Sequence, residues 1–407
     1  MHDEPMRDEP MRNEPMRDDR SRVIWLYCGF QFFFSLLFWV PVFYEYQKRI
    51  GLTDQQIFDI QSIYYVAFCL LEIPTGMAAD MFGAWRCMRD GAMVLVAANL
   101  LPIFAQSYWG LVAHWLLIAL ARSFISGASS AYIYEYLARH DATAEFKQIE
   151  GNARAYGLVG KVVCWAFVGA LMEWRLTSPY WLTVLSAAIA VGFAMALPDV
   201  VVPQSAQPEG VLSRLSSTGA VLVRSPFLAL LMIQGTAIFV LSRLVQVNLF
   251  QPILKAQGYG VTAFGVVMAL MTVFEAIGSA RPGWVRAWLS DLNAVFVLTL
   301  VLAATMLAMP VAGPAGNVAA LCAFALATGL SYPIQRQLMN DHIPDARYRA
   351  TLLSAESIVD RAVCAILAPQ IGLYLEAGKL DRFVSLSAVG TIGGVLLLWW
   401  VLLMRRR

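Results

Sequence analysis

The sequence predicts an all-α membrane protein built from two bundles of six transmembrane helices. Hydrophobic residues make up 59% of the 407 positions and charged residues only 14%, whereas soluble domains carry about 25% charged residues. Apolar runs of about twenty residues, the length needed to cross a bilayer, recur between residues 23 and 404. These runs are continuous and do not alternate with polar residues, so they favour helices over a β-barrel.

The apolar runs fall into two sets of six. We expect spans at 23–47, 54–82, 87–107, 109–138, 147–174, 178–197, 226–255, 262–283, 290–311, 315–339, 349–375 and 382–404. The longest polar interruption lies between the sixth and seventh spans. We therefore predict an N-terminal bundle over residues 21–197, a cytoplasmic linker over 198–225 and a C-terminal bundle over 226–407.

A five-residue motif is repeated three times before the first span. Residues 3–7, 8–12 and 13–17 read DEPMR, DEPMR and NEPMR. Regularly spaced prolines and mixed charges oppose both helix formation and burial in a core. We therefore expect residues 1–20 to form a disordered cytoplasmic tail.

Basic residues are distributed unequally between the two sets of loops. One set contains Arg20, Arg22, Arg86, Arg89, Arg139, Lys147, Arg214, Arg224, Arg281, Arg286, Arg347, Arg349 and Arg405 to Arg407, and the other contains Lys48, Arg49, Arg175, Lys255, Lys379 and Arg382. Cytoplasmic loops are the richer in lysine and arginine. The bias predicts a multi-pass protein with both termini in the cytoplasm, and it explains the basic loops without a nucleic-acid partner.

The sequence lacks the nucleotide-binding and metal-binding motifs that are typical of soluble enzymes. It contains no Walker phosphate loop and no dinucleotide-binding glycine motif, and its four histidines and six cysteines are scattered without metal-ligand spacing. We therefore expect neither enzymatic activity, nor a cofactor, nor a bound metal, and we do not expect ATP to drive the protein.

A charged phrase separates the second and third apolar runs. Residues 76–86 read GMAADMFGAWR, so that Gly76, Asp80, Gly83 and Arg86 lie where two hydrophobic segments meet. We interpret this phrase as a turn at the cytoplasmic face. Its carboxylate is expected to latch an inner gate, by capping a neighbouring helix or pairing with a cation.

Twelve spans, a long central loop and this phrase together resemble the major facilitator superfamily. The loop between the second and third helices of that family reads Gly-x-x-x-Asp-x-x-Gly followed by basic residues. Gly76, Asp80 and Gly83 match that spacing, whereas Ala84 and Trp85 occupy the basic positions. Residues 72–76, 126–128, 131–135 and 349–354 further resemble a bacterial branch rich in presumed drug and metabolite exporters.

The resemblance implies the major facilitator fold, with two pseudo-symmetric bundles around a central cavity. It implies a secondary active transporter, monomeric and located in the bacterial inner membrane. Its expected activity is proton-coupled export of a small amphipathic organic molecule by alternating access. Two alternatives remain open: uptake or export of an anionic metabolite on the same fold, and a membrane sensor or assembly partner that transports nothing.

Several ionisable residues fall inside the predicted spans. Each costs about 2.5–3.5 kcal/mol or more at the bilayer centre, so such residues tend to face a cavity or a partner. The candidates for proton coupling are Glu72, Glu135, Glu275, Glu356 and Asp360. The candidates for counter-charges or substrate contacts are Arg122, Lys161, Arg243 and Arg361.

Glu356 and Asp360 are four residues apart and share one helix face. Two neighbouring carboxylates in a low-dielectric site rarely both stay ionised, which suits a proton carrier. Alternatively, they pair with Arg336, Arg347, Arg349 or the adjacent Arg361. Glu72 is open to the same two interpretations, as a proton site or as a buried ion pair with Arg122 or Lys161.

Overall fold

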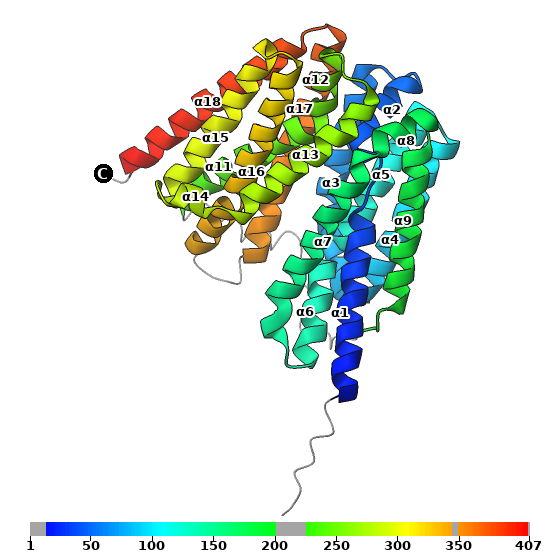
Figure 1. Cartoon of the computed structure of the whole chain (residues 1–407). Helices are drawn as coiled ribbons and strands as arrows, with labels where there is room; N and C mark the ends of the chain where they lie inside the picture. Colours follow the sequence, from blue (N-terminus) through cyan, green and yellow to red (C-terminus); the bar gives the residue numbers. More distant parts are fainter. Residues whose placement is uncertain (1–13, 201–224, 344–348, 406–407) are drawn as a thin grey trace, which may run out of the picture.

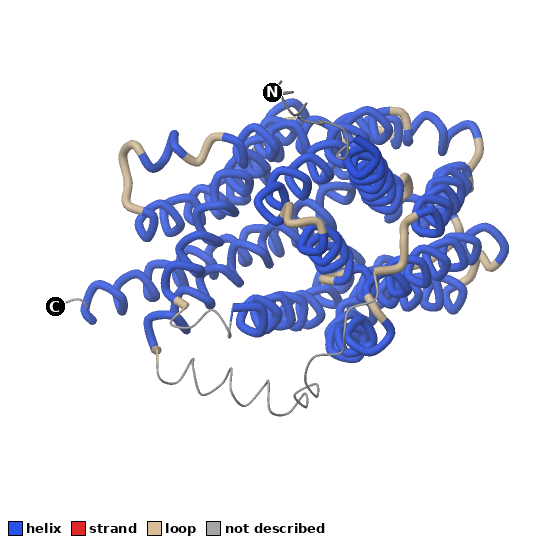
Figure 2. The backbone as a smooth tube through the Cα atoms, turned by 90° about the horizontal axis from the view of Figure 1, so that it is seen from below, coloured by secondary structure: helices blue, strands red, loops and turns tan. Residues whose placement is uncertain are grey.

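The computed structural model describes residues 14–200, 225–343 and 349–405, and those residues form helices and loops without a β-strand (Figures 1 and 2). Ten helical segments are long and apolar enough to cross a membrane, and a bent pair over residues 143–174 makes eleven. α3 (Asp54–Phe82) is a further helix of 29 residues that carries four carboxylates. The fold is therefore the expected all-helical membrane architecture.

Several spans consist of more than one helix. The first six are α1 (Glu14–Ser35) with η1 (Val40–Val42) and α2 (Phe43–Arg49); α3; α4 (Ala84–Phe104); α5 (Tyr108–Ile125) with α6 (Ala128–Arg139); η2 (Thr143–Glu145) and α7 (Phe146–Ala166) with α8 (Val168–Trp174); and α9 (Ser178–Ala196).

The second six follow the same pattern. They are α11 (Pro226–Ser242) with η3 (Arg243–Leu249) and α12 (Phe250–Ala256); α13 (Val261–Ala280), followed by the short α14 (Gly283–Arg286); α15 (Asp291–Ala308) with η4 (Met309–Val311); α16 (Pro314–His342); α17 (Arg349–Glu376); and α18 (Leu380–Arg405). The helices group into six spans before the predicted linker and six spans after it. Residues 201–224 of that linker lie outside the described part of the chain.

Two expectations about the N-terminal part need correction. α1 begins at Glu14, so residues 14–20 of the expected tail are helical, while residues 1–13 are outside the described part. α3 continues to Phe82, so Gly76 and Asp80 lie within a helix and not in a turn. Only Gly83 occupies the turn, where its φ of 91° is costly for any residue with a Cβ.

Three spans are interrupted along their length. Gly127, with a φ of 84°, separates α5 from α6. α7 and α8 meet at an angle of 42°. The seventh span contains a π-helical turn, η3, which begins at Arg243. Such turns are common at functional sites because they redirect side chains.

The two halves of the chain meet along two pairs of helices. α3 packs along α17, and α7 with α8 packs along α13. We call the end where α3 leads into α4 the inner end, because our topology prediction places it in the cytoplasm, and the opposite end the outer end. In Figure 1 the outer end is at the top, where α2, α8 and α12 lie close together.

Polar contacts close the outer end. The Lys255 ammonium lies 2.6 Å from a Glu45 carboxylate oxygen across the two halves. The side-chain carbonyl of Gln251, which is fully buried, accepts a hydrogen bond of 3.1 Å from the Tyr44 amide. The Glu376 carboxylate accepts a 3.1 Å hydrogen bond from the backbone N–H of Gln55. These contacts join α2 and α3 to α12 and α17.

The contact between α3 and α17 stops before the inner end. The Ser62 hydroxyl donates to the Ala365 carbonyl at 2.7 Å, and the Cys69 thiol contacts the Ile358 carbonyl at 3.5 Å. No hydrogen bond joins the described side chains of these two helices closer to the inner end than the Cys69 contact. The halves are therefore bound more closely at the outer end.

Glycines set the spacing between α13 and α16. A Cβ atom at Gly329 would overlap the Glu275 carbonyl, and one at Gly278 would overlap the Leu326 carbonyl. Because backbone cannot move aside as a flexible side chain does, the two helices need glycine at this crossing.

We therefore expect Gly329→Val to lower the melting temperature in detergent, since overpacking costs about 1–3 kcal/mol. Gly394→Val is the matched control, because a Cβ at Gly394 has no atom within 4 Å. Tryptophan fluorescence during heating measures both variants. Equal melting temperatures would show that the crossing tolerates a side chain.

Candidate functional site

A cavity of about 470 Å³ lies between the two halves. It is bounded by α1 and α7 from the first half and by η3 and α13 from the second. The fourteen residues that surround it are Gln31, Ser35, Glu150, Ala153, Arg154, Gly157, Leu158, Lys161, Trp165, Gln246, Met268, Met271, Thr272 and Glu275. Four of them carry charge, and apolar side chains fill the spaces between those charges.

The cavity runs along most of α7. Glu150 is close to the start of α7 and Trp165 close to its end, so the lined stretch is about 22 Å long at 1.5 Å per residue. The Trp165 indole donates a 2.9 Å hydrogen bond to the Leu37 carbonyl, which closes the cavity toward the outer end. The cavity thus begins near the inner end and stops at Trp165, close to the end of α7.

Glu150 is held by the first helix. The Tyr27 hydroxyl donates a 2.8 Å hydrogen bond to Glu150, and the Gln31 amide donates to the same hydroxyl at 3.0 Å. This carboxylate therefore has a polar partner within the N-terminal half.

Lys161 has no such partner. Its ammonium forms neither a hydrogen bond nor an ion pair with the described part of the chain; its nearest aromatic neighbour is the Trp165 ring, whose centroid is 5.8 Å away. Glu275, Arg122 and Arg154 are close enough to act on it electrostatically. The sequence predicted Lys161 as a counter-charge, and the structure places it on the cavity wall.

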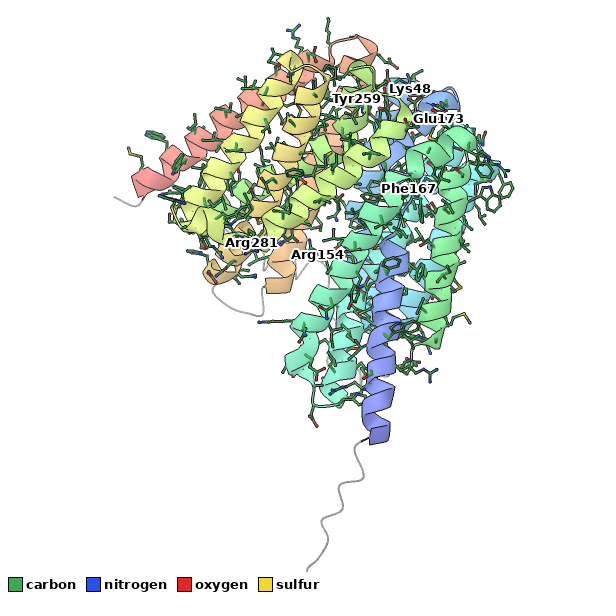
Figure 3. The ribbon with its side chains drawn as sticks, in the orientation of Figure 1. Lys48, Arg154, Phe167, Glu173, Tyr259 and Arg281 are labelled. Carbon is green, nitrogen blue, oxygen red and sulfur yellow. The ribbon has the colours of Figure 1, made fainter. Side chains whose placement is uncertain are left out.

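Glu275 lies on the opposite wall, on α13. Arg154 and Lys161 act on it electrostatically, yet no described cation forms an ion pair with it. Arg154 is exposed and lies over the Tyr332 ring at 5.3 Å, across the two halves; Figure 3 shows it on the side of α7 that faces the second half. The cavity therefore has unpaired charges of opposite sign on its two sides.

A second charged cluster lies on α17. The buried Asp360 carboxylate is 3.2 Å from the Arg243 guanidinium at the start of η3, and 3.8 Å from that of Arg361. Glu356, one turn away and also buried, binds the Arg336 guanidinium of α16 at 2.9 Å. Arg336 was one of the partners considered for Glu356, and Arg361 was one of those considered for Asp360. The pairing of Asp360 with Arg243 was not anticipated from the sequence.

Gly235 on α11 leaves room for the Glu356 side chain. A Cβ atom at Gly235 would overlap both the Glu356 carboxylate and the Gln335 amide. Removing one partner of such a buried ion pair costs about 3–5 kcal/mol, because the other charge is left uncompensated.

The α17 cluster contacts the first half of the chain. The Arg361 guanidinium lies 3.8 Å from the centre of the Phe68 ring on α3. The Asn248 amide of η3 donates a 3.2 Å hydrogen bond to the Tyr65 hydroxyl. The cluster therefore lies at the inner limit of the contact between α3 and α17.

The ion pair of Glu72 with Arg122 or Lys161, one of the two alternatives for this residue, is not formed. Glu72 instead accepts a 3.1 Å hydrogen bond from Ser126, and Arg361 is a cation that acts on it electrostatically. The prediction failed because the break at Gly127 brings Ser126 of the fourth span against Glu72.

Other predicted site residues lie apart from both clusters. Glu135 is on α6, half-buried, and does not line the cavity. Arg86, in the first turn of α4, borders a separate inner-end groove with Asp90. The Asp80 side chain is outside the described part, so its role as a latch remains a prediction.

The sequence interpretation missed two cavity residues, Glu150 and Arg154. Both lie close to the predicted start of the fifth span, where charges are ordinary. Helical spacing could have identified them, because Arg154 is four residues after Glu150 and seven before Lys161. This spacing places all three residues along one face of α7.

Comparison with known proteins gives a family. A family model described as Major Facilitator Superfamily matches residues 25–369. A search of curated proteins by sequence finds no match.

Solved structures of transporters share the fold. A mutant of the nucleoside transporter NupG has a TM-score of 0.79 at 12% identity, over 93% of this chain and 99% of that one. The peptide transporter POT, as a mutant in complex with sulfate, has a TM-score of 0.76 at 13% identity, over 94% of each chain. A bacterial homolog of the human lysosomal transporter Spinster, in an inward-facing and occupied conformation, has a TM-score of 0.71 at 15% identity, over 95% and 97%.

At these identities the structures show the fold alone, whereas the family model covers most of the sequence. Together with the apolar helices, it makes this a multi-pass membrane protein that acts as a transporter of small molecules and not as an enzyme. The chain belongs to the major facilitator superfamily.

Proposed function

We propose that the protein is a proton-coupled exporter of a small amphipathic organic molecule, acting as a monomer in a bacterial inner membrane with both termini in the cytoplasm. The bundles over residues 21–197 and 226–407 rock about the central cavity. The observation that carries the proposal is Asp360, buried between Arg243 and Arg361 at the inner limit of the contact between the halves.

Protonation of Asp360 would change the forces at that contact. The neutral carboxyl no longer holds the Arg243 guanidinium, which must find another partner or move toward water. The Arg361 guanidinium also loses the nearby negative charge but keeps its 2.8 Å hydrogen bond to the Ser357 carbonyl. The Arg361 guanidinium lies over the Phe68 ring of α3, and Tyr65 of the same helix acts on Arg243 electrostatically. A proton on Asp360 therefore alters how firmly α17 holds α3, which is the change that alternating access requires.

The cavity supplies the site for the cargo. Trp165, Met268, Met271 and Leu158 offer an apolar surface, and the charged groups between them orient an amphipathic solute. The direction of transport follows from the resemblance to exporters.

Reconstituted vesicles test coupling and direction together. With an acidic lumen, a proton-driven exchanger accumulates solute inside; with an acidic exterior, only a cotransporter does. We expect accumulation with the acidic lumen for at least one of three labelled probes: ethidium, phenylalanine and 3-phenylpropionate. Folded protein that gives no gradient-dependent flux for any probe would contradict coupling, and flux with the acidic exterior alone would reverse the direction.

A second candidate is transport of an anionic metabolite. Lys161, Arg154 and Arg122 together favour a negative solute on the α7 side of the cavity. If this candidate holds, 3-phenylpropionate is the probe that binds, and Arg122→Ala and Lys161→Ala each abolish its binding.

A further inference from the structure

Building on the proposed function, we infer that the cargo is a zwitterion that bridges the two halves, with its anionic group at Lys161 and its cationic group at Glu275. Lys161 belongs to α7 of the first half and Glu275 to α13 of the second. Both line the same cavity, and each lacks an ion-pair partner among the described residues.

Charge on the α7 wall selects an anionic group. Arg154 and Lys161 both line the cavity there, and Arg122 adds to their field. The one carboxylate on that wall, Glu150, already accepts a hydrogen bond from Tyr27. A carboxylate or phosphate placed between Lys161 and Arg154 would compensate charges that the protein itself leaves unpaired.

The α13 wall requires the opposite charge. Glu275 is half-buried and shares its side of the cavity with Gln246, Met268 and Met271, none of which carries a charge. A solute with only a negative group would approach this carboxylate uncompensated, whereas an ammonium group would neutralise it. The apolar side chains between the two walls then cover the uncharged part of the solute.

Bridging also explains how binding is linked to movement. A zwitterion held at both ends joins one residue from each half, so it stabilises most the conformation in which the two walls are closest. A singly charged analogue contacts one wall and gives no such preference. Bridging therefore determines both which solutes bind and whether the two walls of the cavity close on them.

Two matched sets of probes test the charge requirement by calorimetry in nanodiscs, at one pH and without a gradient. The sets are phenylalanine, 3-phenylpropionate and phenethylamine, and 8-aminooctanoate, octanoate and octylamine. We expect at least one zwitterion to bind at least about tenfold more tightly than both of its singly charged analogues. Equal binding of the anion, or no binding of either zwitterion to folded protein, would overturn the inference.

Charge exchange tests the two residues. Lys161→Glu and Glu275→Lys should each weaken zwitterion binding at least about tenfold, and the double variant should bind more tightly than either single variant, because the solute can then bind in reverse. Lys147→Gln, on the same helix but exposed and outside the cavity, is the control. A double variant no better than either single variant would argue against bridging.

These measurements are independent of proton coupling. Failure of zwitterion binding would leave gradient-driven transport by Asp360 untouched, with a different cargo. Conversely, intact zwitterion binding without gradient-driven flux would remove the coupling and keep the site.

Discussion

Replacing Asp360 by asparagine is expected to abolish proton-driven transport while leaving passive exchange of the same solute largely intact. Asparagine has the shape of a protonated aspartate but cannot release a proton. The Arg243 and Arg361 guanidiniums therefore lose the carboxylate that holds them at 3.2 and 3.8 Å. A pH gradient can then no longer change the charge at position 360, whereas cycling without net proton movement remains possible.

Flux in vesicles separates the two activities. Accumulation driven by a pH gradient should fall about a hundredfold, whereas exchange of labelled for unlabelled solute at equal pH should change only a few-fold. Asp381→Asn, at the exposed outer start of α18, is the matched control and should behave like the natural protein. Gradient-driven accumulation that survives Asp360→Asn would exclude Asp360 as the coupling residue.

A buried arginine without its partner could prevent folding, so a second variant is needed. In Arg243→Gln/Asp360→Asn the carboxylate and the nearer of its two guanidiniums are removed together, and Arg361 keeps its hydrogen bond to the Ser357 carbonyl. Proton-driven flux should remain absent in the double variant, while its melting temperature should exceed that of Asp360→Asn. Together the two variants distinguish a loss of coupling from a loss of structure.

Segment length and composition were sufficient to predict the fold. The second span was expected at 54–82 and is α3 (Asp54–Phe82), and the sixth was expected at 178–197 and is α9 (Ser178–Ala196). The bilayer requires long apolar helices, so their positions are encoded locally in the sequence. The same local information identified Lys161, Glu275 and Asp360 as ionisable residues within spans.

The partners of these residues could not be derived in the same way. Arg243 and Asp360 are separated by 117 positions, and their contact depends on how α17 packs against the seventh span. The π-helical turn that begins at Arg243 has no hydrophobic pattern that distinguishes it from an α-helix. The partners considered for Glu72 in one of its two alternatives are wrong for a similar reason, because the break at Gly127 decides what faces it.

Substitution of Gly265 by leucine is expected to force the outer end open. A Cβ atom at Gly265 on α13 would overlap the Trp165 carbonyl of α7, and one at Gly169 on α8 would overlap the Val261 carbonyl. All four positions lie where α7 and α8 cross α13 between the two halves. Because backbone meets backbone, a larger residue can be accepted only if the helices separate.

Separation of these helices favours the conformation that is open at the outer end. Overpacking costs about 1–3 kcal/mol, so the closed population should fall about fivefold to 150-fold. The Lys255–Glu45 ion pair and the Gln251 hydrogen bond oppose the change, but the first is half-exposed and therefore weak. Transport should slow strongly, since the protein can no longer complete its cycle.

Spin labels at Arg175 and Ala256, both exposed at the outer end of opposite halves, measure the opening in a cysteine-free background. Their distance distribution should shift to longer values in Gly265→Leu. Gly192→Leu is the matched control, because a Cβ at that position on α9 meets no atom within 4 Å. An unchanged distribution in folded Gly265→Leu would mean that this crossing does not control the outer gate, and that closure depends on the α3–α17 contact instead.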